Sequence, residues 1–228
     1  MIENFESVRN YIKLPLFLQQ GDSVAIISPS GAIKPENVNS AIEILQSWGL
    51  HVVTGQNIYK QSGVFAGTDS ERSADFQNMI GNANIKAIFC SRGGYGAIRI
   101  VEKLDFSNFQ QNPKWIIGFS DITVFHAKLC SIHIASIHGA MPKNFTSITK
   151  DSLDSLKKTI FGKNISYTFK TSHCNKLGKA TGQLVGGNLS MLYSMRGLDF
   201  EYDYSNKILF IEDLNEYFYH IDRIMQNL

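Results

Sequence analysis

Residues 115–123 read W-I-I-G-F-S-D-I-T and combine a buried strand, a sharp turn and the start of a helix. The apolar run 115–118 predicts a strand, and the pattern over 122–130 predicts a helix. Ser120 falls in the turn between them, an arrangement similar to the elbow that exposes a nucleophilic serine in some hydrolases. A second interpretation is that Ser120 or Asp121 only caps the helix. The residues of this stretch leave both interpretations open.

The alternation of strand and helix continues on both sides of this stretch. Further strands are predicted at 23–28, 51–54, 85–90 and 133–138. Helices are predicted from Pro35 to Trp48, from Asp69 to Ile80, and over 97–104. Strands that alternate with helices indicate an α/β fold, with a parallel sheet covered by helices on both faces. In such sheets the functional groups gather at the carboxyl ends of the strands.

The character of the chain changes after about residue 146. We expect a first domain over 14–145, a linker over 146–179 that includes a helix at 151–161, and a second, smaller unit over 180–228. Strands at 180–185 and 207–212 and a helix from Tyr217 to the end predict a mixed α/β unit. A unit of this size is marginal unless it packs against a neighbour.

Composition narrows the function classes. Hydrophobic residues make up 43% and charged residues 18%, which favours a packed core and excludes a disordered chain. The 22 basic and 20 acidic residues give a net charge of +2, too even for a dedicated nucleic-acid binder. Neither a signal peptide nor an apolar run long enough to cross a membrane is visible, so we expect a cytoplasmic protein without a membrane partner.

Metal and disulfide chemistry are not indicated by the cysteines and histidines. The three cysteines lie far apart without C-x-x-C spacing, and the six histidines form no H-x-x-x-H pattern. We therefore expect no metal and no cofactor. His138 ends a predicted strand of the same sheet as Ser120, so it is a candidate for the same face of the site.

Three further motifs are candidates for chemistry. The glycine-rich S-R-G-G-Y-G at 91–96 follows a strand and suits an anion-binding loop or a plain tight turn. The apolar strand I-L-F-I-E-D ends in Glu212 and Asp213, where a carboxylate can orient an imidazole or simply be solvated. The turn G-Q-L-V-G-G-N-L-S at 182–190 places Asn188 near a helix start, as a substrate ligand or a cap.

Together these motifs resemble those of the LD-carboxypeptidase family, serine peptidases of type S66. The family includes murein tetrapeptide carboxypeptidases and microcin C immunity peptidases. The motifs occur in order, from G-D-S-V-A-I-I-S-P-S-G at 21–31 through S-R-G-G-Y-G, G-F-S-D-I-T, I-H-G-A-M-P at 137–142 and G-Q-L-V-G-G-N-L-S to F-I-E-D-L-N-E, followed by Y-H-I-D-R-I. The resemblance implies a Rossmann-like N-terminal domain, a smaller C-terminal domain and a homodimer. It also implies cleavage of an amide bond between an L-centre and a terminal D-amino acid, typically the D-alanine of a muropeptide.

The resemblance also implies a role for individual residues. Ser120 corresponds to the nucleophile and Glu212 to the triad acid. The backbone N–H groups of Asp121 and of Gly93 or Gly94 correspond to the oxyanion hole. The candidates for holding the peptide substrate are Arg92, Gly187, Asn188 and His138.

One member of the family's triad has no counterpart in this sequence. The family's catalytic histidine follows the F-I-E-D segment, whereas the sequence ends at Leu228, 16 residues after Glu212. His220 is the only histidine in that stretch, and it lies in a predicted helix. We expect an incomplete C-terminal domain and an inactive or weak 228-residue form, because a serine without its base loses activation.

Other functions remain open from the sequence. A non-catalytic module that binds a muropeptide or a nucleotide-like anion through the glycine loop is one alternative. An immunity peptidase that cuts a peptidyl nucleotide is another. A nucleotide-binding Rossmann protein is less favoured, because S-P-S-G at 28–31 replaces the expected G-x-G-x-x-G.

Overall fold

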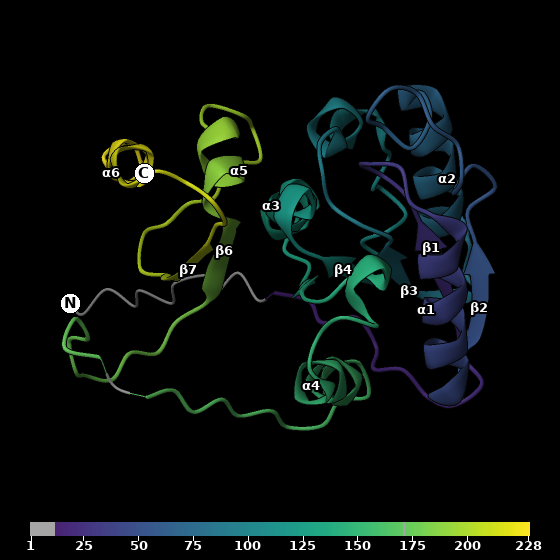
Figure 1. The fold of residues 1–228 in the computed structure, drawn as a ribbon, viewed down its shortest axis with the longest axis horizontal. Helices are drawn as coiled ribbons and strands as arrows, with labels where there is room; N and C mark the ends of the chain where they lie inside the picture. The colour runs from purple at the N-terminus through teal and green to yellow at the C-terminus, as the bar shows by residue number, and fades with distance from the viewer. Residues whose placement is uncertain (1–11, 171) are drawn as a thin grey trace, which may run out of the picture.

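The fold contains a five-stranded parallel sheet and a separate two-stranded sheet (Figure 1). The computed structural model describes residues 12–170 and 172–228. The larger sheet has the order β2-β1-β3-β4-β5, and all its pairs are parallel. Its strands are β1 (Ser23–Ile27), β2 (His51–Thr54), β3 (Ile85–Cys90), β4 (Trp115–Gly118) and β5 (Ile137–His138). The α/β architecture expected from the sequence is confirmed.

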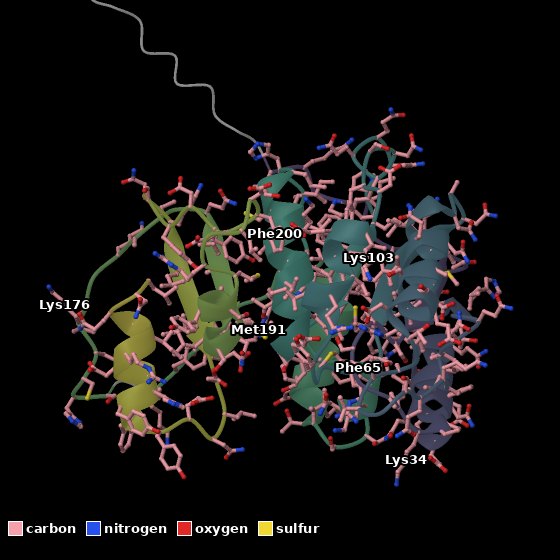
Figure 2. The ribbon with its side chains drawn as sticks, turned by 90° about the horizontal axis from the view of Figure 1, so that it is seen from above. Lys34, Phe65, Lys103, Lys176, Met191 and Phe200 are labelled. Carbon is pink, nitrogen blue, oxygen red and sulfur yellow. The ribbon has the colours of Figure 1, made fainter. Side chains whose placement is uncertain are left out.

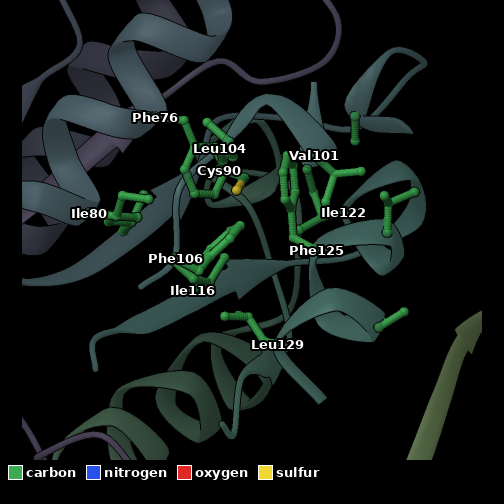
Figure 3. Close-up of a cluster of buried hydrophobic side chains, with 14 of the residues drawn as sticks. Phe76, Ile80, Cys90, Val101, Leu104, Phe106, Ile116, Ile122, Phe125 and Leu129 are labelled. Carbon is green, nitrogen blue, oxygen red and sulfur yellow. The ribbon is translucent and has the colours of Figure 1, made fainter. Parts of the chain in front are cut away.

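Both faces of the larger sheet are buried. Alternate residues of β1 enter different cores, with Ala25 and Ile27 on one side and Val24 and Ile26 on the other. Helices α2 (Asp69–Gly81) and α3 (Thr123–Ser131) cover the first side, where the rings of Phe76 and Phe125 lie 4.4 Å apart (Figure 3). Helices α1 (Pro35–Ser47) and α4 (Lys150–Ile160) cover the second. Burial on both faces explains why the inner strands β1, β3 and β4 are largely apolar runs, whereas the edge strand β2 is partly exposed.

The second unit packs against the first through α3. It contains β6 (Leu184–Asn188), α5 (Leu189–Ser194), β7 (Ile208–Glu212) and α6 (Phe218–Met225), and β6 and β7 are parallel. Buried apolar side chains of this unit, including Leu192 and Phe200, join the core around α3, and Met191 packs against that core (Figure 2). A unit too small for a core of its own thus shares one with the first unit.

The connection between the two units runs along the outside of the molecule (Figure 1). After α4, residues 162–170 and 172–182 are exposed and form no helix or strand. The two units meet mainly where α3 packs against α5 and β6. In the part of the chain that the structure describes, no helix has the length and apolar character that crossing a membrane requires.

The expected helix at 97–104 is wrong in type. The segment forms two 3₁₀ turns, Ala97–Arg99 and Val101–Lys103. Ala97, Ile100 and Val101 are all buried, so the apolar spacing identified the inward face correctly. The run is short and begins at Gly96 with a φ of +124°, and short segments of this kind often adopt the tighter helix.

Two expected strands have different limits in the structure. The strand expected at 180–185 is β6, at Leu184–Asn188, and it includes Gly186 and Gly187. Glycine is depleted in strands, so the pattern placed a turn where the strand lies. The strand expected at 133–138 shortens to β5, since His133 has a φ of +59°.

Candidate active site

Ser120 lies on a strained turn at the carboxyl end of β4. Its φ is +62°, a left-handed conformation that is uncommon for residues other than glycine. Gly118 makes the turn possible, because a Cβ there would lie 2.8 Å from the Ile122 side chain. Helix α3 begins at Thr123, and no side chain caps it. The capping interpretation of Ser120 and Asp121 is therefore wrong.

The glycine loop at 91–96 lies directly against Ser120. A Cβ on Gly93 would stand 2.9 Å from the Ser120 Cβ and 3.0 Å from its Oγ, so only glycine fits. Within residues 12–170 and 172–228, the backbone N–H groups of Gly93 and Gly94 donate no hydrogen bond. The loop thus brings unpaired donors close to the serine hydroxyl.

Asp121 connects the serine turn to two neighbouring loops. Its buried carboxylate accepts hydrogen bonds from the Ser30 hydroxyl at 2.6 Å and from the Ala97 N–H at 2.9 Å. Burial raises the pKa of Asp121, and these hydrogen bonds oppose that effect. The Asp121 side chain therefore fixes the loops after β1 and β3 around the turn, while its backbone N–H lies at the start of the helical segment.

Two arginine side chains stabilise the same loops by donating hydrogen bonds to backbone carbonyls. Arg72 of α2 is buried and donates hydrogen bonds to the carbonyls of Pro29 and Gly96. Arg92 is half-buried and donates to the carbonyls of Gly93 at 3.2 Å and Ala32 at 3.0 Å. Sequence reasoning singled out Arg92 but missed Arg72. Arg72 stands four and eight residues before the buried Phe76 and Ile80, so helical spacing places it on the inward face of α2, a signal that could have found it.

Asn188 and Gly187 bring the second unit up to the serine turn. The Asn188 N–H donates to the Thr123 hydroxyl at 3.0 Å, and the Asn188 side chain caps α5 through the Met191 N–H. Gly187 has a φ of +144°, and a Cβ there would lie 2.6 Å from the Thr123 Oγ1. Of the two roles that the sequence left open for Asn188, the cap is present in the structure and substrate binding stays a prediction; β6 meets the first residue of α3.

Glu212 and Asp213 have different surroundings, although they are neighbours in the chain. Asp213 accepts hydrogen bonds from the N–H and hydroxyl of Ser190 and from the Asn188 amide. Glu212 pairs with Asn188 across the small sheet, and its Oε1 lies 3.7 Å from the His138 Nε2. Burial and the charge of Asp213 raise the pKa of Glu212. Asp213 thus stabilises the turn that leads from β6 into α5, while Glu212 faces the larger sheet.

His126 and His220 are both engaged in contacts with other side chains or the backbone. The His126 ring nitrogens lie 2.8 Å from the Ser136 hydroxyl and 2.8 Å from the Gly118 carbonyl. Burial lowers the pKa of His126 from its ordinary value of 6.5 to about 4. His220 pairs with Glu216 at 2.8 Å on α6. In the described ranges, no group of three histidine, cysteine, aspartate or glutamate side chains is arranged to hold a metal ion.

Comparisons with known proteins show which family the chain resembles over most of its length. The sequence profile of the LD-carboxypeptidase N-terminal domain matches residues 24–139, and that of the C-terminal domain matches residues 181–228. A probable murein peptide carboxypeptidase from Bacillus subtilis (strain 168) is 38% identical over 225 residues, which cover 94% of this chain and 69% of the relative.

Two solved structures have the same fold. Muramoyltetrapeptide carboxypeptidase from Oxalobacter formigenes is 30% identical, with a TM-score of 0.78 over 90% of this chain and 70% of that protein. An MccF-like protein from Bacillus anthracis is 24% identical, with a TM-score of 0.82 over 94% of this chain and 75% of that protein. The ordered motifs, the profile matches and the identity to the Bacillus subtilis relative show that the chain belongs to the LD-carboxypeptidase family of serine peptidases, S66.

Proposed function

We propose that this protein is a serine LD-carboxypeptidase that releases terminal D-alanine from muropeptides, a step of peptidoglycan recycling in the cytoplasm. The observation that carries the proposal is the Ser120 turn. It combines a left-handed serine, the first turn of a helix, and a glycine, Gly93, where an added Cβ would lie 3.0 Å from the serine hydroxyl. This arrangement suits an exposed nucleophile beside backbone donors.

The proposed chemistry follows from these positions. The Ser120 Oγ attacks the carbonyl of the L-to-D amide and loses its proton to a base. The backbone N–H groups of Asp121 and of Gly93 or Gly94 stabilise the negative oxygen that forms. The C–N bond then breaks, D-alanine leaves with a proton on its amine, and water hydrolyses the acyl-serine. Glu212 orients the imidazole that acts as base.

The substrate side of the proposal uses the glycine loop and β6. Arg92 fixes the carbonyls beside the oxyanion donors and presents a cation at the edge of the site. Gly187 and Asn188 offer a close backbone approach from the second unit. The muropeptide assignment is supported by the relatives named above, which are described as murein peptide and muramoyltetrapeptide carboxypeptidases.

The identity of the base limits the activity that we propose for the 228-residue form. Within the described residues, no histidine forms a hydrogen bond with the Ser120 hydroxyl. His126 uses both ring nitrogens elsewhere, and His220 pairs with Glu216. We therefore expect slow turnover, since a serine without a hydrogen-bonded base lacks most of the acceleration of a serine hydrolase.

The test measures D-alanine released from a murein tetrapeptide by the 228-residue chain, together with covalent labelling of Ser120 by a fluorophosphonate. We expect slow release and labelling, both abolished in Ser120→Ala and retained in the control Ser131→Ala, whose hydroxyl is exposed on α3. Release that survives Ser120→Ala would refute the assignment of the nucleophile. Tight muropeptide binding with neither release nor labelling would favour a non-catalytic binding module.

A further inference from the structure

His138 and Glu212 come from different sheets and meet where both strands end. His138 is the last residue of β5, beside Gly118 of β4 in the parallel register. Glu212 is the last residue of β7, beside Asn188 of β6. The His138 Nε2 and the Glu212 Oε1 lie 3.7 Å apart, within ion-pair range but longer than a hydrogen bond. This contact joins the two units at the edge where Ser120 lies.

Aromatic rings restrict the position of the His138 imidazole. The Phe210 ring of β7 meets it edge-on at 5.2 Å, and the Phe119 ring lies 6.1 Å away. Phe210 and Glu212 are two residues apart on one strand and therefore point to the same face. The same strand thus supplies both a packing surface for the imidazole and the carboxylate that faces it.

Two polar atoms of this contact are buried without a hydrogen-bond partner in the described part of the chain. They are the His138 Nδ1 and the Glu212 Oε1. A buried polar atom without a partner costs free energy, so such atoms are rare in structural contacts and more common at functional ones. A small adjustment of either side chain turns the 3.7 Å approach into a hydrogen bond that satisfies the Glu212 oxygen.

The charged groups around the contact favour this pairing over others. Burial lowers the pKa of His138, so the imidazole is neutral at ordinary pH and donates or accepts through its ring nitrogens. The neighbouring His126 ring on α3 lies 6.0 Å away, and burial keeps it neutral as well. Asp213, the residue that follows β7, directs its carboxylate to Ser190 and Asn188. Glu212 is the acid that remains to face His138.

We propose that His138 is a positioning residue that holds Glu212 through its Nε2–H, leaving the second carboxylate oxygen free to orient the catalytic base. This inference rests on the proposed function for the use of Glu212, but the contact itself is independent of turnover. The sequence suggested a substrate-binding role for His138, whereas this proposal assigns His138 a contact with Glu212, the proposed triad acid. It also explains why a histidine, rather than an apolar residue, occupies a half-buried strand end among aromatic rings.

Nuclear magnetic resonance of the isotope-labelled 228-residue chain tests the contact directly. The ring signal of His138 is followed against pH in the wild type, in Glu212→Gln and in Glu216→Gln. We expect His138 to titrate at lower pH in Glu212→Gln, because the imidazolium loses its counter-charge while the side-chain shape is kept. The matched control Glu216→Gln should leave His138 unchanged and move only the ring signals of His220, its own partner.

A second pair of variants separates positioning from mere packing. The amide nitrogen of Gln reaches the place of the histidine Nε2, whereas that of Asn reaches the place of Nδ1. The side-chain carboxyl signal of Glu212 should therefore titrate at higher pH in His138→Asn and return toward the wild-type curve in His138→Gln. An unchanged indole N–H signal of Trp115, which is buried at the start of β4, confirms that each variant is folded.

Identical His138 curves in the wild type and Glu212→Gln, or identical Glu212 curves in His138→Asn and His138→Gln, would overturn the proposal. Neither measurement uses D-alanine release or labelling of Ser120. Failure of the proposed carboxypeptidase function and failure of the His138 contact are thus distinguishable.

Discussion

Acidification should destabilise the protein through His126 in a defined pH window. His126 is fully buried, and the Gly118 carbonyl can only accept a hydrogen bond, so the His126 Nε2 carries the proton of the neutral ring. Its pKa falls from 6.5 to about 4 on folding because burial disfavours the charged form. Between these two pH values, His126 is therefore protonated in the unfolded chain and neutral in the folded chain.

The direction and size of the effect follow from the two pKa values. Stability from neutral His126 is fully present above about pH 6.5, declines as the pH falls toward about 4, and declines no further below that value, where both states are protonated. The gap between the two pKa values, at about 1.4 kcal/mol for each pH unit, amounts to about 3 kcal/mol. This is a large part of the stability of an ordinary domain.

Urea unfolding at a series of pH values measures this contribution. His126→Gln keeps a donor near the Gly118 carbonyl but cannot be protonated, so its stability should lose about 3 kcal/mol less than that of the wild type across the window. The exposed His51→Gln serves as the control and should follow the wild-type curve. If His126→Gln loses as much stability as the wild type between about pH 6.5 and 4, the reasoning is refuted.

Three further predictions concern the serine turn and its supports. Gly93→Ala should slow fluorophosphonate labelling of Ser120 by about a hundredfold, because the added Cβ displaces the hydroxyl. In the control Gly178→Ala the added Cβ meets open space, so Ser120 should be labelled at the normal rate. Equal labelling rates in the two variants would contradict the steric argument. Ser120→Gly should be more stable in urea than Ser120→Ala by about 1 kcal/mol, because glycine alone relieves the left-handed conformation, and equal stability would indicate an unstrained turn. Arg72→Met should lower the free energy of unfolding by about 2 kcal/mol or more, since it leaves two buried carbonyls without a donor. Asp69 forms ion pairs with both Arg72 and Arg99. The control Arg99→Met removes the exposed one of these two arginines and should cost much less stability; a similar loss in both would show that the carbonyl contacts are unimportant.

The larger sheet could be predicted from sequence because its strands carry one simple signal. Ile85–Cys90 and Trp115–Gly118 are continuous apolar runs closed by turn residues, and burial on both faces demands such runs. Helix α2 begins at Asp69 as expected, but its N-cap is Thr68, one residue earlier, which forms a capping box with Glu71. These signals are local, so neighbouring residues suffice to detect them.

The small sheet was harder to predict because contacts distant in the chain determine its position. Gly186 and Gly187 read as a turn, yet they lie inside β6, where the backbone passes close to β7 and α3. The contact of His138 with Glu212 joins residues 74 positions apart and leaves no mark in either motif. The sequence supplies the candidate site residues, whose roles stay predictions, but their contact partners follow only from the packing of α3 against β6.

The parallel register of β6 and β7 makes the identity of the acid depend on correct strand alignment during folding. A slip of one residue would present Ile211 or Asp213 in the place of Glu212 and turn the proposed acid to the opposite face. A Cβ on Gly186 would lie 1.8 Å from the Phe210 carbonyl oxygen, so the close approach that seats this register is open only to glycine at that position. The absence of a side chain at Gly186 thereby determines which carboxylate lies at the edge of the sheet near Ser120. Variants at Gly186 should consequently yield misaligned protein rather than a correctly folded enzyme with altered specificity.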